Sequence, residues 1–385
     1  MTLPTRPVEI KALAGARALP PLILVLYHYC EGHGYRHNPW FDLVIGKGYL
    51  WVEFFFALSG FILIHVYGAQ ADKFRHGAYG PFLRNRLIRL YPLHLVTLFS
   101  MLLLMGVLNL IAQIYGYVSI YNGPWPPMNT WPSFIATLFM VQAWNLFPWL
   151  TWNEASWFVS AEFLLCLLFP LYVLWAKGGI KRALLMGAAA MAALGWLAAS
   201  NRHGLDLTFH NGILRGAADF AMGCALAMFY REAVRKGAHK IPAWIFSLAQ
   251  LLSLALIVWA FYGIRWAHGP KDVWIAGTLF LLIFVLAFDR GFLANLLKTA
   301  PFRKLGEWSY AIYMGQIFWL QLFRYFSQRV YPPGETQVFG FAVGDLLWRF
   351  EPWVLLILCV LWGALLYYSV EVPAAKALKK LFTKP

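Results

Sequence analysis

The chain of 385 residues is 61% hydrophobic and 13% charged, whereas an average soluble domain is about 45–50% apolar and about 25% charged. This composition argues against a soluble globular protein. The formal net charge of +15 would suggest a nucleic-acid partner in a soluble protein, but in a membrane protein Lys and Arg gather in cytoplasmic loops. We therefore interpret the charge as a record of membrane topology and expect the lipid bilayer, rather than nucleic acid, as a partner.

About ten apolar stretches are candidates for transmembrane helices, because a span needs about 20 mainly apolar residues. A further apolar stretch, 133–150, is interrupted by Pro148. We expect a short interfacial or re-entrant helix there, since a full span would invert every later loop. The sequence thus predicts an all-α polytopic membrane protein with a single integral-membrane domain over 1–385. The predicted spans are 18–32, 49–67, 91–114, 156–176, 183–200, 212–230, 243–262, 273–288, 308–327 and 352–370.

The distribution of Lys and Arg sets the predicted orientation. If the N-terminus is cytoplasmic, most of these residues fall in inner segments, so the positive-inside rule predicts that both termini are cytoplasmic in a multi-pass protein of the cell (inner) membrane. Arg6, Lys11 and Arg17 precede the first apolar run, as in a secretory signal. That run contains His28 and Tyr29 and has no small-residue cleavage site, so we expect it to remain as the first span.

The four cysteines do not form a disulfide or metal-binding pattern. Each lies singly inside an apolar stretch, without the paired spacing that such frameworks show. We therefore expect small buried hydrophobic side chains and no bound metal. The four are Cys30, Cys166, Cys224 and Cys359.

Arg17 lies at the start of the first span, and His28 lies within it. Ionisable side chains inside a membrane are energetically costly and usually functional. On one continuous helix, His28 would lie about 16 Å above Arg17 on nearly the same face, which is about half of a roughly 30 Å hydrocarbon core. The arginine would hold an anionic group at the inner surface while the histidine acts near the midplane. A snorkelling arginine and a histidine bonded to a neighbouring helix explain the spacing equally well.

A basic segment leads into the third span and contains Lys73, Arg75, Arg84, Arg86 and Arg89. Arg86 and Arg89 are three residues apart and so share one helix face at the mouth of the span. Clustered guanidinium groups suit bidentate phosphate binding. On composition alone, a positive-inside anchor is the simpler explanation.

Two acidic residues lie inside otherwise apolar spans. Glu162 follows Trp157 and Ser160 near the start of the fourth span, and Glu53 lies in the second. A carboxylate at this depth would orient a histidine or relay a proton. A structural hydrogen bond between helices explains either residue equally well.

Polar side chains recur at helical spacing in the ninth span. Ser309 and Tyr313 stand at i and i+4, Tyr310 lies between them, and Gln316 follows Tyr313 at i+3. Small and polar residues commonly pack helices together in membranes. The pattern alone favours that role.

The order of these segments resembles the acyltransferase-3 family of membrane acyltransferases, nearly from end to end. Arg17 and His28 are similar to the family's motif of a basic residue, ten spacers and a histidine. Arg86-Leu-Ile-Arg89 with Pro92 is similar to its Arg-x-x-Arg segment. Further similar segments are 48–61 with Glu53, Trp157 with Ser160 and Glu162, 214–226 with Arg215, 305–313 with Tyr310 and Tyr313, and Glu371-Val-Pro373.

Two positions depart from the family's pattern. Phe158 replaces the first serine of the tryptophan motif, and Gln316 stands where the family often has a histidine. The second departure leaves His28 as the strongest candidate base.

The resemblance implies an enzyme that moves an acyl group, most simply acetyl, from cytoplasmic acyl-CoA to a hydroxyl of a cell-surface glycan, glycolipid or similar acceptor. Acyl-CoA would be a co-substrate, and no tightly bound cofactor is expected. His28 would be the general base, and Glu162, or less favourably Glu53, would fix its tautomer as the acid does in a catalytic triad. The residues that would bind the CoA phosphates are Arg17, Arg84, Arg86 and Arg89.

Other functions and routes fit parts of the pattern. Direct transfer and a covalent acyl-histidine relay are both compatible with the sequence. A transporter or lipid flippase would also place polar residues in a central pathway, typically with repeated halves, and no repeat is visible. A non-enzymatic scaffold would have little use for His28 and Glu162 at depth. The aromatic residues of the outer segments suit sugar stacking or interfacial belts; they are Tyr115, Tyr117, Tyr121, Trp125, Trp131, Trp144, Trp149 and Trp152.

Overall fold

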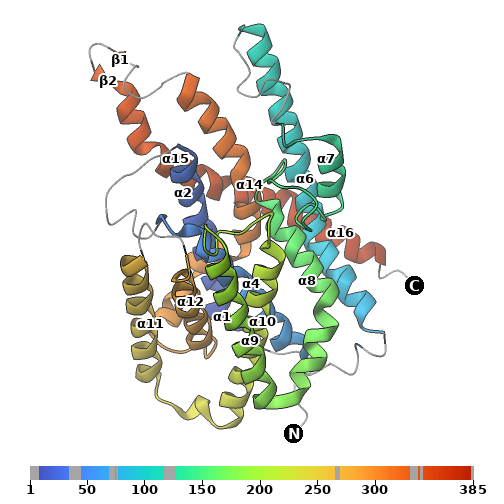
Figure 1. Cartoon of the computed structure of the whole chain (residues 1–385), viewed down its shortest axis with the longest axis vertical. Coiled ribbons are helices and arrows are strands. Elements are labelled where there is room, and N and C mark those ends of the chain that lie inside the picture. The colour runs from blue at the N-terminus through green and yellow to red at the C-terminus, as the bar shows by residue number, and fades with distance from the viewer. Residues whose placement is uncertain are drawn as a thin grey trace.

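The computed structural model describes residues 8–33, 45–68, 74, 77–116, 127–264, 269–329, 337–338 and 341–382. These residues form a helical bundle (Figure 1), which confirms the predicted all-α fold class, with one short antiparallel pair of strands, β1 (Gln337–Val338) and β2 (Phe341–Ala342). The helices are α1 (Lys11–Ala16), α2 (Leu19–His33), η1 (Gly48–Leu50), α4 (Trp51–Tyr67), α6 (Tyr79–Ile114), α7 (Trp131–Leu138), α8 (Ser156–Trp175), η3 (Ala176–Gly178), α9 (Gly179–Ser200), α10 (Gly212–Arg235), η4 (Ala238–Lys240), α11 (Ala243–Ile264), α12 (Asp272–Leu286), α13 (Phe292–Leu297), α14 (Ala300–Arg329), α15 (Val343–Leu366), η5 (Tyr367–Glu371) and α16 (Val372–Phe382).

Seven helical stretches of the described chain are long and apolar enough to cross a membrane. The protein is therefore a multi-pass integral membrane protein. Each predicted span falls on a helix, although α12 is shorter than a typical span and α14 is more polar. The total of ten spans and the cytoplasmic position of the termini stay predictions.

The stretch 133–150 contains only a short helix. α7 has eight residues and is about 12 Å long, and the residues after it form turns and bends. Thr130 and Ser133 cap its start reciprocally, since each side chain accepts a hydrogen bond from the other's backbone N–H. A helix this short does not cross the bilayer, in agreement with the sequence.

The first span is broken beside Arg17. α1 ends at Ala16, α2 begins at Leu19, and the two residues between them form a turn. Pro20 and Pro21 explain the break, because neither has the N–H that would continue the helical ladder. The assumption of one continuous helix from Arg17 to His28 was therefore wrong, and Arg17 lies at a corner between two helices.

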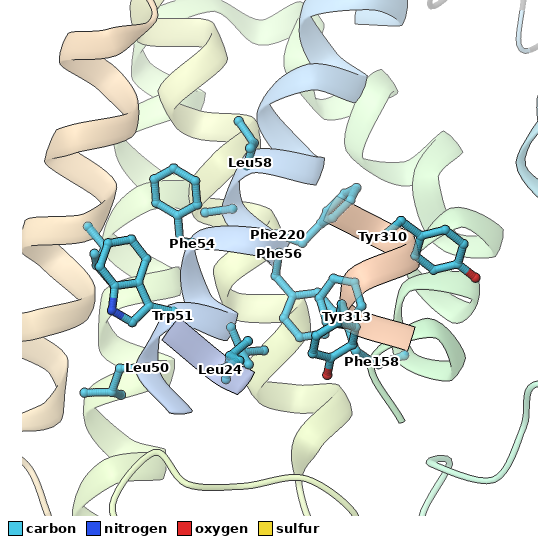
Figure 2. Close-up of a cluster of buried hydrophobic side chains, with 14 of the residues drawn as sticks. Leu24, Leu50, Trp51, Phe54, Phe56, Leu58, Phe158, Phe220, Tyr310 and Tyr313 are labelled. Atoms are coloured by element: carbon cyan, nitrogen blue, oxygen red, sulfur yellow. The ribbon is translucent and has the colours of Figure 1, made fainter. Parts of the chain in front are cut away.

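Small residues allow close packing between two helices of the bundle. A Cβ atom on Gly223 of α10 would clash with the carbonyl of Ala57, and one on Gly60 of α4 would clash with that of Phe220. The backbones of α4 and α10 therefore touch directly, as small residues permit in membrane bundles. Beside this contact, α2, α4, α8, α10 and α14 contribute to a buried, largely aromatic cluster (Figure 2).

Candidate active site

A small pocket of about 80 Å³, lined by both charged and apolar side chains, lies beside this aromatic cluster. Side chains of α4, α6, α8 and α14 form its walls, and the corner between α1 and α2 contributes Arg17. We call it the arginine pocket. Its lining includes six residues singled out from the sequence as site residues, together with their neighbours: Arg17, Phe55, Leu58, Ser59, Ile62, Arg86, Arg89, Leu90, Phe158, Glu162, Ser309, Tyr310 and Tyr313.

Positive charge prevails in this pocket. Arg17, Arg86 and Arg89 line it together with one carboxylate, Glu162, and Arg17 interacts electrostatically with all three of the others. Glu162 is buried and accepts a hydrogen bond from Ser59 Oγ at 2.9 Å. Guanidinium groups that outnumber carboxylates form a site for a planar or phosphorylated anion. The pocket is therefore suited to a negatively charged or strongly polarised group.

Three aromatic rings form one wall of the arginine pocket. The ring centroids of Phe55 and Phe158 are 5.6 Å apart, and Tyr313 lies 5.9 Å from Phe55 and 5.7 Å from Phe158. Figure 2 shows Phe158 and Tyr313 next to each other beside Phe56. Phe158 therefore fills space that the family's serine would leave open.

His28 lies outside the lining of the arginine pocket and is paired with Gln316. Its Nδ1 is 3.2 Å from Gln316 Oε1, and Gln316 Nε2 donates to the carbonyl of Tyr313 at 3.0 Å. That second bond turns the amide oxygen toward His28. Because an amide oxygen only accepts, Nδ1 carries the proton and Nε2 keeps its lone pair. This tautomer, assigned from the hydrogen-bond network, is the one that a general base at Nε2 requires.

The structure does not bring together His28 and the predicted carboxylates. Glu162 is bonded to Ser59, and both oxygens of Glu53 accept hydrogen bonds from Arg215, at 3.0 Å and 2.7 Å. The expectation that Glu162, or less favourably Glu53, orients the histidine is therefore not supported. The amide of Gln316 occupies the orienting position instead.

The Glu53–Arg215 pair joins α4 to α10 inside the bundle. Both side chains are fully buried, and Arg215 also donates to the carbonyls of Leu207 and Tyr49. The ring of Trp157 lies beside the guanidinium, 5.9 Å from its carbon. Trp157 and Glu53 thus belong to one ion-pair network that holds helices together.

Several other predicted residues have structural contacts. Ser160 Oγ accepts the backbone N–H of Ala143, which ties the turns after α7 to α8. Tyr310 donates to the carbonyl of Leu90 at 2.7 Å, which ties α14 to α6. Arg84 lies over the ring of Phe382 at 5.6 Å and does not line the arginine pocket. Trp152, one of the outer aromatic residues, is buried and bonded to Ser133, so it cannot stack on a sugar.

Some predicted residues lie outside the described part of the chain, namely Lys73, Arg75, Tyr117, Tyr121 and Trp125. Within the described residues, no group of three or more His, Cys, Asp or Glu side chains could hold a metal ion.

A second cavity, of about 670 Å³, contains residues that sequence reasoning missed. It shares Arg17 and Arg89 with the arginine pocket and adds Lys376 and Lys379 from the last helix. The available signal was the amphipathic lysine spacing after Pro373, which resembled an ordinary cytoplasmic tail. We call this cavity the basin; its lining is Arg17, Tyr67, Asn85, Ile88, Arg89, Gly306, Glu307, Tyr367, Glu371, Val372, Ala375, Lys376 and Lys379.

Fold and site together define a polytopic membrane protein built around an arginine-lined pocket, with a histidine–glutamine pair one helical turn along α14 from its aromatic wall. The acyltransferase-3 family model, described as an acyltransferase domain, matches residues 10–370. The chain belongs to this family and is a membrane acyltransferase.

Two curated proteins are similar to the chain. Acyltransferase MdmB of Streptomyces mycarofaciens is 27% identical over 343 residues, which cover 81% of this chain and 79% of that protein. Protein 2 in picA locus of Rhizobium radiobacter is 37% identical over 94 residues, which cover 24% of this chain and 44% of that protein. No solved structure matches the chain.

Proposed function

We propose that this acyltransferase moves an acyl group, most simply acetyl, from cytoplasmic acyl-CoA to a hydroxyl of a cell-surface glycan, glycolipid or similar acceptor. The observation that carries the proposal is the arginine pocket, which presents Arg17, Arg86 and Arg89 inside a membrane bundle. An acyl-CoA donor matches that charge, because its phosphates are anionic and its thioester carbonyl becomes negative during transfer. The acceptor class rests on the family resemblance.

His28 acts as the general base in this proposal. Nε2 takes the proton of the acceptor hydroxyl while the oxygen attacks the thioester carbonyl, and the C–O bond forms as the C–S bond breaks. The proton then passes to the departing CoA thiolate. Gln316 holds Nδ1–H and so keeps the lone pair on Nε2, the positioning role that an acid has in a catalytic triad.

The direct test is product formation by the purified protein in lipid vesicles. Acetyl-CoA labelled in the acetyl group is supplied with envelope glycans as acceptors, and mass spectrometry follows the gain of one acetyl mass. We expect acceptor labelling together with release of CoA thiol. A transporter would move substrate between the two sides without releasing thiol, which would overturn the proposal.

Removing the arginines should weaken use of the donor. In the variant Arg86→Ala with Arg89→Ala, we expect KM for acetyl-CoA to rise by at least about 10- to 100-fold, the effect of losing a single charge-assisted bond of about 1.5–3 kcal/mol. The matched control removes Arg235 and Lys236, which are exposed and outside both cavities. Steady-state kinetics at saturating acceptor give KM. Equal KM values in the two double variants would indicate that Arg86 and Arg89 set the membrane topology and do not bind the donor.

Phe158 should limit the length of the acyl group. Phe158→Ser shortens a side chain in the wall of the pocket, so we expect kcat/KM for butyryl-CoA to rise relative to acetyl-CoA by about tenfold, the scale of one or two methylenes in an apolar site. Phe56→Ser is the control, because Phe56 packs on Phe158 but does not line the pocket. An unchanged ratio of the two donors in Phe158→Ser would contradict the prediction.

A further inference from the structure

The basin and the arginine pocket differ in what they can hold. The arginine pocket has a volume of about 80 Å³, while the basin has about 670 Å³. Pockets that bind small molecules and cofactors usually have about 300–1,000 Å³. Of these two cavities in the described part of the chain, the basin has room for a nucleotide, and the arginine pocket has room for a narrow chain. The two cavities meet at Arg17 and Arg89, which line both.

Helix α16 forms one wall of the basin. The lining positions 372, 375, 376 and 379 follow the i, i+3, i+4, i+7 spacing of a single helix face. α16 packs against α6, and Arg84 of α6 lies over the ring of Phe382 near its end. Figure 1 shows α16 lying beside α6. The basin-facing lysines of α16 are thus held next to the arginines of α6.

A π-helical turn lies immediately before α16, the helix that forms this wall. η5 precedes Pro373, a residue that removes one backbone donor and disturbs the helical ladder before it. π-helical turns are rare and frequently occur at functional sites. Glu371, at the end of the turn, lines the basin and interacts electrostatically with Arg89 and Arg17.

The basin carries excess positive charge. Four cationic side chains line it, Arg17, Arg89, Lys376 and Lys379, against the carboxylates of Glu307 and Glu371. Glu307 is already paired with Lys304 at 2.9 Å. A multiply charged anion is therefore the ligand that this lining fits, since lysine binds phosphate as a compact point charge.

We propose that Lys376 and Lys379 bind the 3′-phosphorylated adenosine diphosphate end of the acyl-CoA donor in the basin. The pantetheine arm then passes Arg17 and Arg89 and enters the arginine pocket, which carries the thioester toward His28. This proposal rests on acyl-CoA being the donor. It gives the nucleotide phosphates to the lysines of α16 together with Arg17 and Arg89, which line both cavities, and leaves Arg86, which of these two cavities lines the arginine pocket alone, for the reacting end.

Binding of adenosine 3′,5′-bisphosphate tests the site without turnover. Titration calorimetry on the purified wild type should detect binding, and Lys376→Ala with Lys379→Ala should weaken it at least about tenfold. Lys380→Ala, on the same helix but outside the basin lining, should bind as the wild type does. No binding by the wild type, or equal binding by all variants, would overturn the proposal.

Kinetics with a donor that lacks the nucleotide distinguish nucleotide binding by the two lysines from other roles of these residues. The double lysine variant should raise KM for acetyl-CoA and leave KM for acetyl-pantetheine unchanged. If the lysines instead bind anionic lipid headgroups, activity with both donors would fall together and would depend on the phosphatidylglycerol content of the vesicles, and the proposal would fail. If nucleotide binding depends on the lysines but no acyl-CoA is consumed, the site stands and the proposed transfer reaction falls.

Discussion

His28→Asn is expected to lower kcat by about 10²- to 10⁴-fold, the usual contribution of a general base, and to leave KM for acetyl-CoA nearly unchanged. Asparagine can still donate to Gln316 Oε1, so the link between α2 and α14 is kept. It cannot accept the proton of the acceptor hydroxyl. Steady-state kinetics in vesicles, with unfolding midpoints to show that the variant folds, measure this effect. Full activity in His28→Asn would remove His28 from the mechanism.

Variants of Gln316 distinguish the positioning of the His28 ring from proton transfer by His28. Gln316→Leu removes the acceptor for Nδ1–H and should lower kcat with little effect on KM, whereas Gln316→Glu keeps an acceptor oxygen and should retain more activity. A purely structural role would lower the yield of folded protein in both variants and leave kcat of the folded fraction unchanged.

A single-turnover experiment distinguishes direct transfer from an acyl-histidine relay. Labelled acetyl-CoA is mixed with wild-type protein without acceptor, the protein is denatured, and the label that stays on the chain is counted. Label on the wild type that is absent from His28→Ala supports a covalent intermediate. Without such label, direct attack by the acceptor hydroxyl is the mechanism.

Breaking the buried pair of Glu53 and Arg215 is expected to reduce the free energy of unfolding by about 3–5 kcal/mol, because the partner is left as an uncompensated buried charge. Both side chains are fully buried, and the pair is bidentate. Unfolding midpoints in detergent for Glu53→Ala and Arg215→Ala measure the loss. If Glu53 were instead catalytic, Glu53→Ala would fold like the wild type and lack activity.

A double-mutant cycle isolates this interaction. The double variant Glu53→Leu with Arg215→Leu should be more stable than the sum of the losses in Glu53→Leu and Arg215→Leu alone predicts, although the carbonyls of Leu207 and Tyr49 lose their donors. The exposed pair of Glu232 and Arg235 at the end of the same helix is the matched control. Its removal should cost about 0–1 kcal/mol. Equal losses at both pairs would contradict the structural role of Glu53.

Periodicity and charge predicted the helical architecture well because a bilayer permits few kinds of backbone structure. Each predicted span coincides with a helix, since a run of apolar residues in a membrane must satisfy its backbone internally. The break beside Arg17 was missed although its cause, Pro20 and Pro21, is visible in the sequence. Because prolines are tolerated in the first turn of a helix, Pro20 and Pro21 did not exclude a span that begins at residue 18, one residue before the observed start of α2 at Leu19.

Side-chain partners were harder to predict than helices. Sequence order could not show whether Glu53, Glu162 or Gln316 reaches His28, because each lies on a different helix and partner choice depends on helix rotation. It also could not show that the lysines of α16 share a cavity with Arg17, since more than 350 residues separate them along the chain. Arg215 resembled a family position, and only packing revealed its role as the partner of Glu53.

The anchoring of α1 has a consequence for biogenesis. The N–H of Ala12 donates to Asp289, which lies 277 residues later, and Gly15 and Gly306 allow α1 to touch the backbones near Leu297 and of α14. None of these anchors exists while the ribosome is still making the first half of the chain. Helix α1, which ends just before Arg17, is among the first parts to be synthesised, yet it reaches its final place only after residues 289–306 have been made.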